Sequence, residues 1–391
     1  MLDSPVRGFP VGEFETRLER LHKLMSAKGL TGILLMSEPE VRYFTGFLTQ
    51  FWQSPTRPWF LFIPVDKKPI AVIPEIGAAL MRTTWIDDIR TWGAPWPKDD
   101  GISLLQDLLE PLLKSGGRLG VMKGHETSLR MPLGDYERLM SGLSGIEVVD
   151  TTDILRNLRM VKTEAEIGKI THICEIASRT FARTGDIIYK GQSLAEAFRA
   201  FRIECLTQGA DDVPYLAGSA DQGGYRDIIS PPSNRSLESG DILMFDTGAT
   251  FDGYFCDFDR NYAIEKADDL SRRAYDTLWR ATEAGLSTAQ PGRTCRDLFQ
   301  SMQNVISEMD DQGGEVGRYG HGLGMQLTEQ PSHAVFDDTV LEENMVITLE
   351  PSLNYGDGRI MVHEENLVVQ NGKPRLLSVR AIPELPIIGV S

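Results

Sequence analysis

Cysteine is scarce in this chain of 391 residues, and the four cysteines present lie far apart in the sequence. They form no C-x-x-C pair, which argues against a thiolate zinc site and against a disulfide framework. Reduced thiols fit this usage best, so we expect a cytoplasmic protein. The first residues, MLDSPVRGFPVGEF, contain no apolar segment of the kind that secretory signals carry.

Long hydrophobic runs are also absent, and positive charge is in deficit. No run of about 18 apolar residues occurs, so we expect no membrane-spanning helix. The net charge of −16 opposes binding to phosphate backbones, which argues against a nucleic-acid partner. The hydrophobic content of 41% and charged content of 25% are ordinary for a soluble globular protein. A chain of this length is large enough for two or three domains.

The first part of the chain alternates helical and strand-like patterns. FETRLERLHKLMSAKGL has apolar residues at helical spacing and closes at Gly29, and TGILLM follows as an apolar strand. PWFLFIP and PIAVIP are typical of further strands, and GISLLQDLLEPLLKS is typical of a helix. This alternation predicts an α/β domain over residues 1–155.

The second part has a different character. Thr163 and Glu166 form a capping-box pattern that predicts a long helix through about Tyr189, followed by a helix over Leu194–Gln208. From Asp241 onward, paired strand-like runs surround two helical stretches at about 267–288 and 295–310. We expect an α+β domain with antiparallel pairing over residues 156–391.

Three aspartates surround a predicted hairpin in ILMFDTGATFDGYFCDFDRNYAI. Asp252-Gly253 is a strong two-residue turn pattern, and such a turn places Asp257 opposite Gly248. Asp246 then projects from the same face as Asp257, as does Asp259, so the carboxylates could converge on one cation or a close metal pair. A solvated hairpin with acidic residues on its wet face is the ordinary alternative. The spacing does not fit an EF-hand calcium loop.

Three further candidate ligands follow. His321 lies between glycines in RYGHGLG, Glu350 ends an apolar run in ENMVITLEPSL, and Glu364 precedes an apolar strand in RIMVHEENLVV. Taken singly, the histidine could be structural and each glutamate a surface residue at a strand end. Together, four carboxylates and one imidazole suit a hard or borderline divalent ion.

Read in order, these segments resemble the M24 metallopeptidase superfamily, whose members include methionine aminopeptidase, aminopeptidase P, prolidase and creatinase. The shared pattern is two aspartates eleven residues apart, an H-G-x-G box, a T-x-E-P segment and a final glutamate strand; here these are Asp246, Asp257, His321, Glu350 and Glu364. VRYFTGF and LRMVKTEAEI are similar to segments of the creatinase/prolidase branch. The resemblance implies a creatinase-like N-terminal domain and a pita-bread catalytic domain.

The resemblance also implies roles for these residues. Asp246 would hold one divalent ion, Asp257 and Glu364 would bridge two, and His321 with Glu350 would complete the second site. Manganese, cobalt, zinc and iron are all compatible with this ligand set, with manganese favoured. Two such ions would activate water and polarise the scissile carbonyl, and Glu350 would carry a proton to the leaving nitrogen. Creatinase lacks this ligand set, so a metal-free mechanism of its kind is not expected.

The pattern departs from peptidase relatives at three positions. Thr328 and Ile229 stand where those relatives have histidines that contact the substrate or the tetrahedral intermediate. Asp259 replaces a frequent threonine, and it could bind metal through water or pair with Arg260. His333 is a further candidate for substrate contact, whereas His363 should point away from Glu364 because strand neighbours face opposite sides.

Trp52, Arg57 and Trp59 cluster before a predicted strand. In dimeric relatives this region approaches the partner's site, so the resemblance implies a homodimer. Arg57 could clamp a substrate carboxylate, and the aromatic rings could enclose a cationic group. An ordinary interface patch is the alternative.

The expected function is hydrolysis of a peptide or small amide bond with two divalent ions, in its most specific form as an Xaa-Pro dipeptidase or aminopeptidase. The substrate would be a short peptide or small molecule. Two alternatives stay open: a metal-dependent lyase on a small zwitterion such as dimethylsulfoniopropionate, and a non-catalytic binding protein with the same fold.

Overall fold

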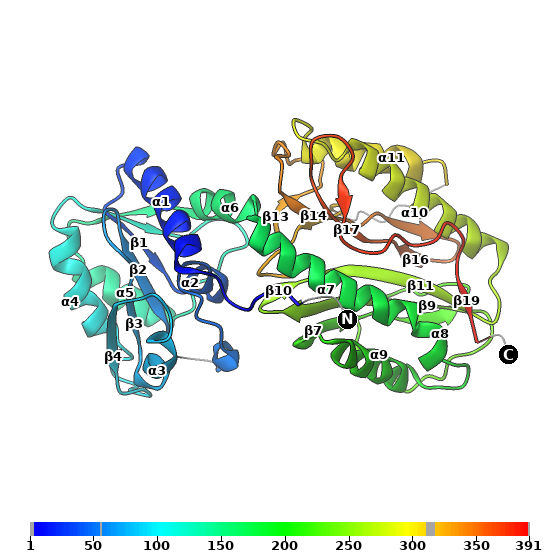
Figure 1. The fold of residues 1–391 in the computed structure, drawn as a ribbon, viewed down its shortest axis with the longest axis horizontal. Coiled ribbons are helices and arrows are strands. Elements are labelled where there is room, and N and C mark those ends of the chain that lie inside the picture. Colours follow the sequence, from blue (N-terminus) through cyan, green and yellow to red (C-terminus); the bar gives the residue numbers. More distant parts are fainter. Residues whose placement is uncertain (1–3, 55–56, 310–316, 390–391) are drawn as a thin grey trace. The chain divides into compact units, whose positions relative to one another are not determined.

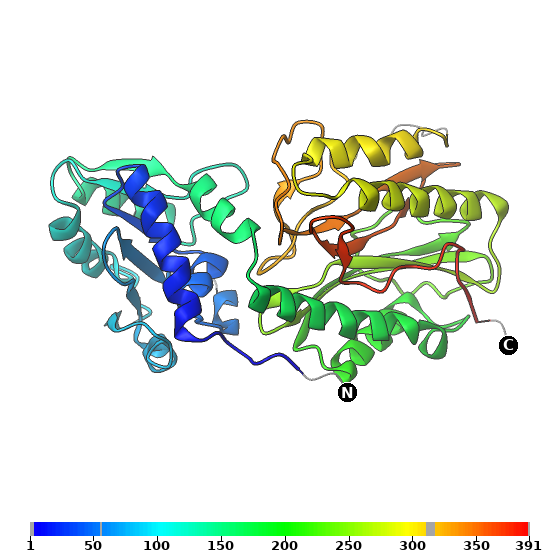
Figure 2. The same cartoon turned by 45° about the horizontal axis from the view of Figure 1, so that its top comes forward.

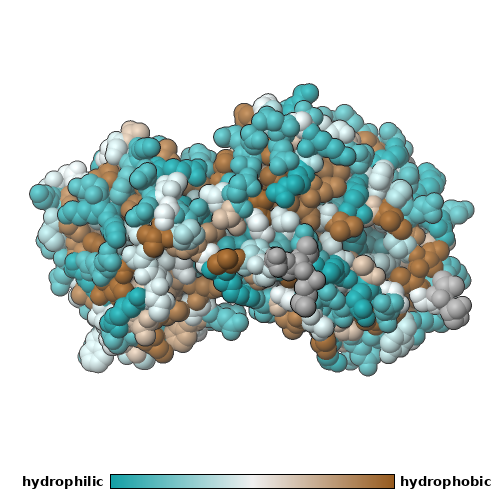
Figure 3. Space-filling model, in the orientation of Figure 1, coloured by the Kyte–Doolittle hydropathy of each residue, from teal (hydrophilic) through white to brown (hydrophobic). Residues whose placement is uncertain are grey.

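The computed structural model describes residues 4–54, 57–309 and 317–389. Contacts divide the chain into two compact units, Val6–Arg159 and Met160–Ser391, with Pro5 belonging to the second. The domain boundary that the sequence places after residue 155 stays a prediction. Figure 3 shows a face that is mostly hydrophilic, with hydrophobic residues in separate patches. No helix among the described residues is long and apolar enough to cross a membrane.

The N-terminal unit is the α/β layer structure that the alternating pattern predicts. Its mixed sheet has the order β4-β3-β2-β1-β5-β6, in which β2 pairs antiparallel with both β1 and β3 and the other neighbours are parallel. The strands are β1 (Gly32–Leu35), β2 (Phe60–Pro64), β3 (Ile70–Pro74), β4 (Asp88–Trp92), β5 (Arg118–Val121) and β6 (Glu147–Asp150). The helices are α1 (Val11–Ala27), α2 (Glu38–Thr45), α3 (Ala78–Met81), α4 (Ile102–Leu113), α5 (Leu133–Gly142) and α6 (Thr152–Met160), with short 3₁₀ turns η1 (Gln50–Gln53) and η2 (Glu75–Gly77).

The C-terminal unit contains two main sheets between two groups of helices, as Figures 1 and 2 show from different sides. The helices α7 (Glu164–Ala182), α8 (Thr184–Ile187) and α9 (Leu194–Gln208) lie on one side, and α10 (Asp269–Thr288) and α11 (Cys295–Ile306) lie on the other. The pairing is antiparallel except between β11 and β19.

The first of these sheets has the order β10-β9-β11-β19, with β7 and β8 also pairing with β9. Its strands are β7 (Asp212–Ala217), β8 (Ala220–Gln222), β9 (Asp241–Phe251), β10 (Tyr254–Phe255), β11 (Phe258–Ile264) and β19 (Ile387–Ile388). The second has the order β13-β12-β14-β17-β18. Its strands are β12 (His321–Gly322), β13 (Glu329–Ser332), β14 (Val346–Leu349), β17 (Glu365–Val368) and β18 (Arg375–Leu376), and β15 (Ser352–Tyr355) forms a separate pair with β16 (Arg359–Val362).

The helix predicted through Tyr189 ends earlier than expected. Thr163 and Glu166 form the predicted capping box, but α7 stops at Ala182 and the short α8 follows. The N–H of Arg183 donates to the carbonyl of Thr180, an i−3 contact that tightens the last turn, and Gly185 follows where helix propensity is low. The last predicted helix also ends early, at Ile306, and Asp310 lies outside the described residues.

A buried ion pair ties the start of α7 to the second sheet. The ammonium of Lys162 lies 3.1 Å from the carboxylate of Glu329, and both side chains are buried. Lys162 belongs to the LRMVKTEAEI segment, so that segment supplies both a helix cap and an anchor for β13. Removing either partner would leave an uncompensated buried charge.

A substitution at Gly320 tests how tightly the loop before β12 is packed. Its φ is +125°, and an added Cβ would lie 2.4 Å from the carbonyl oxygen of Thr348. We expect Gly320→Ala to lower the free energy of unfolding by more than about 1 kcal/mol, because both the backbone conformation and the space oppose a side chain. Gly168→Ala in α7 is the matched control: no heavy atom lies within 4 Å of its Cβ position, and a gain of about 0.5–1 kcal/mol is expected. Urea unfolding followed by circular dichroism measures both, and an unchanged Gly320→Ala protein would contradict the packing described.

Candidate metal centre

The β9–β11 hairpin has the register that its sequence predicts. Asp252 and Gly253 form the turn with φ of 47° and 74°, as a type I′ turn requires. Phe251 pairs with Tyr254, and Asp246 pairs with Asp259 directly across the strands. Continuing this register puts Asp257 opposite Gly248, so the three aspartates project from one face.

Asp257, His321 and Glu364 form the compact centre of the site. One ligand atom of each lies within 4.8 Å of the others, and all three side chains are buried. The residues come from the β9–β11 hairpin, from β12 and from the residue before β17, so three separate segments meet here. Imidazole nitrogen and carboxylate oxygen are ligands that divalent transition metals accept.

The ring of His321 is oriented for ligation. Its Nδ1 lies 2.8 Å from the carbonyl oxygen of Gly322, and because that oxygen can only accept, Nδ1 carries the proton. The free Nε2 faces the carboxylates, 3.5 Å from Asp257 Oδ2 and 3.9 Å from Glu350 Oε2. Burial lowers the pKa of His321 to about 4, so the ring is neutral, as a metal ligand must be.

Glu350 and Asp246 lie at the edge of this group. Glu350 follows β14, and its backbone N–H donates to the carbonyl of Tyr319 at 3.1 Å. Its side chain is 27% exposed, against 4% for His321 and 6% for Asp257, so it is more open to solvent than these two candidate ligands. Asp246 accepts a hydrogen bond from the Tyr215 hydroxyl at 3.0 Å through Oδ2.

The carboxylates repel one another strongly without a cation. Burial, and then the neighbouring negative charges, raise the pKa of Asp257 and of Glu364 well above the usual range. Burial and the charge of Asp246 raise the pKa of Glu350 to about 8, and burial raises that of Asp246 to about 6. These groups fit divalent ions, because only a cation lets all of them ionise together at neutral pH.

Unsatisfied oxygens point to the same conclusion. Asp246 Oδ1, Asp259 Oδ2 and Glu364 Oε1 are buried and have no hydrogen-bond partner within the part of the chain that the structure describes. Buried acceptors without donors are costly and uncommon in folded proteins. Three of them at one place are the strongest structural sign that this face binds a positively charged group.

Other residues, which the sequence patterns did not single out, hold the candidate ligands in place. The side-chain oxygen of Asn366 accepts the N–H of Asp257 at 2.9 Å, and its amide nitrogen donates to the Asp257 carbonyl. Arg318 is a half-buried cation whose charge lowers the pKa of Asp257 and of Glu350. Asn366 follows Glu364 by two residues and Arg318 precedes His321 by three, but only their fold positions show that they act there.

The suggested pairing of Asp259 with Arg260 does not form as a side-chain ion pair. Arg260 instead donates to the backbone carbonyl of Asp259, and its charge opposes the rise in the pKa of the Asp259 carboxyl. As neighbours on β11 their side chains face opposite sides, and Arg260 binds the Glu365 carboxylate at 2.9 Å and the Glu364 carbonyl at 2.9 Å. His363 also points away from the candidate ligands, as predicted, since its Nε2 lies 3.6 Å from Glu365.

The five residues predicted to contact substrate divide between the two units. Trp52 and Trp59 are buried in the N-terminal unit, with ring centroids 5.8 Å apart, and the guanidinium of Arg57 lies over the ring of Phe51 at 5.3 Å. In the C-terminal unit, His333 is fully buried and Thr328 is half-buried just before β13. The burial of these residues, which leaves Trp52 7%, Trp59 1% and His333 0% exposed, counts against their direct contact with substrate.

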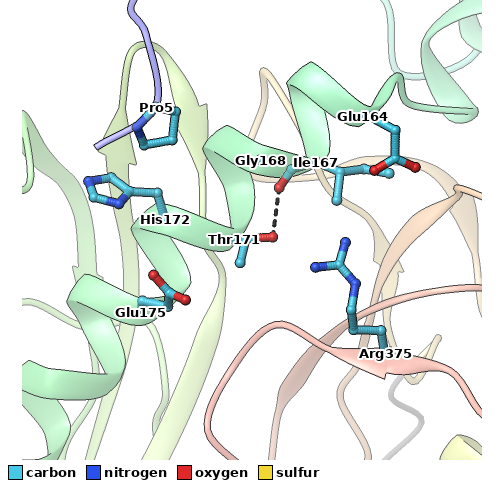
Figure 4. A pocket seen from close by; sticks show the side chains of 8 residues that line it. All are labelled: Pro5, Glu164, Ile167, Gly168, Thr171, His172, Glu175 and Arg375. Atoms are coloured by element: carbon cyan, nitrogen blue, oxygen red, sulfur yellow. Dashed lines mark hydrogen bonds between the residues drawn. The ribbon is translucent and has the colours of Figure 1, made fainter. Parts of the chain in front are cut away.

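Cavities elsewhere do not include the candidate ligands. One of about 290 Å³ follows the outer side of α7 from Glu164 to Glu175, with Pro5 and Arg375 completing its wall (Figure 4). Another, of about 340 Å³, lies behind β11 and is lined by Arg260, Arg380 and mainly apolar side chains. Neither cavity contains the group of residues that would bind a cation.

Comparison with known proteins identifies the family of each part of the chain. Residues 168–371 match the model of metallopeptidase family M24, and residues 17–161 match the creatinase/prolidase N-terminal domain. The chain is 30% identical to the Xaa-Pro dipeptidase of Pyrococcus horikoshii over 92% of this chain and 96% of that protein. Both matches confirm the family resemblance and the predicted pair of folds.

Solved structures share the whole fold. The dipeptidase PepE of Mycobacterium ulcerans superposes with a TM-score of 0.84 at 24% identity, covering 97% of this chain and 99% of that chain. The X-Pro aminopeptidase of Thermotoga maritima gives 0.80 at 23% identity, covering 95% and 99%. At this identity the likeness shows the creatinase-like and pita-bread folds alone.

The raised pKa of Glu350 predicts how the metal-free protein responds to pH. The ordinary pKa is 4.5 and the folded value is about 8, so the folded state holds this proton more tightly than the unfolded state. The stabilisation is therefore complete below about pH 4.5 and is lost as pH rises to about 8. We expect the melting temperature in EDTA to fall across this range, and to fall less steeply in Glu350→Gln.

Manganese should reverse the trend, because ligands bind metal in their deprotonated form. Melting temperatures of both proteins, measured with EDTA and with Mn²⁺ at each pH, provide the comparison. Equal slopes for the two proteins in EDTA would contradict the raised pKa of Glu350.

Proposed function

We propose that this chain, which belongs to metallopeptidase family M24 and carries a creatinase/prolidase N-terminal domain, is a metal-dependent hydrolase of a short peptide or small amide. Its most specific form is an Xaa-Pro dipeptidase. The observation that carries the proposal is the buried group of Asp257, His321 and Glu364, whose ligand atoms lie within 4.8 Å of one another. A buried group of this composition can be fully ionised at neutral pH only with a cation.

Two divalent ions would be held by Asp246, Asp257, His321, Glu350 and Glu364. Bound there, such ions supply a Lewis acid for the scissile carbonyl and lower the pKa of water. In this proposal Asp257 and Glu364 would contribute to both ion positions, Asp246 would hold the first ion, and His321 with Glu350 would complete the second position. The 3.9 Å separation between His321 Nε2 and Glu350 Oε2 supports the last pairing.

Glu350 is the residue to which we assign proton transfer. Its side chain is more exposed than those of His321 and Asp257, and burial with the charge of Asp246 raises its pKa to about 8, which supports a proton-carrying role. From this position it can take a proton on the solvent side and deliver it to the leaving nitrogen. His321 would remain neutral and serve as a ligand alone.

The substrate class rests on the relatives. The protein of Pyrococcus horikoshii is an Xaa-Pro dipeptidase by name, and Xaa-Pro dipeptides are therefore the first substrates to test. Thr328 and Ile229 replace the histidines expected in peptidases, and Ile229 is 78% exposed in a loop. A threonine hydroxyl donates a hydrogen bond but carries no charge, so a small amide other than Xaa-Pro is the main competing substrate.

We further propose manganese as the native ion, because four of the five ligands are carboxylates. A homodimer in the cytoplasm is proposed on the family resemblance and on the cysteine usage.

The proposal predicts metal-dependent turnover that fails when a bridging ligand is removed. A panel of Xaa-Pro dipeptides, longer Xaa-Pro peptides and small N-acyl or cyclic amides is assayed with Mn²⁺ and with EDTA. Asp257→Asn and Glu364→Gln should each lower kcat/KM by at least about 100-fold, since even changes beside metal ligands cost 10–100-fold. Asp276→Asn, an exposed carboxylate on α10, is the control and should keep full activity.

Turnover that persists in EDTA would reject the metal-dependent mechanism. Failure on every Xaa-Pro peptide, with turnover of a small amide, would reject only the dipeptidase assignment. Reaction in ¹⁸O-labelled water separates hydrolysis from the lyase alternative, because only hydrolysis incorporates the label into the product.

A further inference from the structure

We infer that Asp259 is an additional metal ligand, which shares with Asp246 the ion on the side of the centre away from His321. This inference rests on the proposed metal centre and deepens it. In this arrangement carboxylates alone would bind one of the two ions.

The position of Asp259 is fixed by the hairpin register. It lies directly across from Asp246 on β9, and two side chains opposite each other in an antiparallel pair have Cβ atoms about 4.5–5.5 Å apart. Its neighbour Arg260 points to the other face and binds Glu365, so the guanidinium of Arg260 does not neutralise the carboxylate by direct contact. Asp259 is 1% exposed and is therefore also hidden from solvent.

The two oxygens of Asp259 have different surroundings. Oδ1 accepts the backbone N–H of Glu364 at 2.8 Å, which places this carboxylate beside a proposed bridging ligand. Oδ2 is buried and has no partner in the described part of the chain, and the same is true of Asp246 Oδ1. When both carboxylates are ionised, these two acceptors on directly opposed residues cannot satisfy each other, and leaving both buried without a donor is costly.

A cation bound by both oxygens resolves this conflict. A neutral donor such as water could satisfy one acceptor, but it would leave the repulsion between the carboxylates in place. Tyr215 already donates to the other oxygen of Asp246, so the structure provides one donor for this carboxylate and leaves Oδ1 for another group. The two unpartnered oxygens therefore mark a place for a positive ion.

The two proposed ion positions then differ in the atoms that would bind the ion. His321 supplies an imidazole nitrogen near Asp257 and Glu350, whereas Asp246 and Asp259 supply only oxygen. Oxygen-only ligation suits hard ions such as manganese, and an imidazole suits softer ones. The two ions are accordingly not equivalent, and the loss of Asp259 should weaken one of them.

Asp259→Asn tests the inference with little change in shape. Asparagine keeps an oxygen that can accept the Glu364 N–H, but it removes the negative charge and the second ligand oxygen. The full chain is stripped with EDTA and titrated with Mn²⁺ alone, with free ion followed by electron paramagnetic resonance. Wild type should bind two ions, and Asp259→Asn should bind one of them at least about 10-fold more weakly while the other is unchanged.

Thermal unfolding provides a second readout that is independent of activity. In EDTA the Asp259→Asn protein should melt at the same temperature as wild type or higher, because a repelling charge is gone. Its gain in melting temperature on adding Mn²⁺ should be smaller than that of wild type. Asp276→Asn, which removes an exposed charge on α10, should behave as wild type in both measurements.

The outcomes separate the inference from the function on which it rests. If wild type binds two Mn²⁺ ions and Asp259→Asn binds both as tightly, Asp259 is not a ligand and the proposed centre stands. If wild type binds no Mn²⁺, the proposed function fails together with the inference. Equal weakening of both ions would show that Asp259 acts by positioning Glu364, and would also overturn the inference.

Discussion

Repulsion among buried carboxylates is the constraint on which this structure depends. Asp246, Asp257 and Asp259 project from one face of a hairpin, and Glu350 and Glu364 approach that face from the second sheet. Burial removes the water that would otherwise screen them, so their pKa values rise. A fold that gathers these groups can have all of them ionised at neutral pH only if a cation joins them.

The surrounding residues make that arrangement rigid. Asn366 binds both backbone groups of Asp257, and Arg260 holds the carbonyl of Glu364 while its other nitrogen binds Glu365. Each of these contacts joins the hairpin sheet to β17 of the second sheet. The ligands are therefore positioned by the junction of two sheets and not by one loop, which suits a site whose geometry must survive binding and release of substrate.

The sequence predicted residues for substrate contact less well than it predicted the group of candidate metal ligands. Trp52 and Trp59 look like exposed aromatic residues in a loop-like stretch, yet they pack into the core of the N-terminal unit beside Phe47 and Phe51. His333 was a candidate for substrate contact, but it is fully buried, and its N–H donates to the carbonyl of Gly320 beside His321. Composition alone does not separate an aromatic or histidine residue that meets a ligand from one that fills a core.

The sequence by itself determined the hairpin and which aspartates share its face, because these depend on short-range rules. A two-residue Asp-Gly turn sets the register, and a side-chain period of two then decides which aspartates share a face. The capping boxes at Thr163 and Ser193 mark two helix starts in the same local way.

Only the tertiary structure decided which partners the residues of the hairpin meet. The Arg260 side chain binds the carboxylate of Glu365, and Asn366 accepts the N–H of Asp257. Two opposed aspartates, Asp246 and Asp259, each have a buried oxygen without a partner in the described part of the chain. Such contacts join residues more than one hundred positions apart or depend on burial, and no local pattern encodes either.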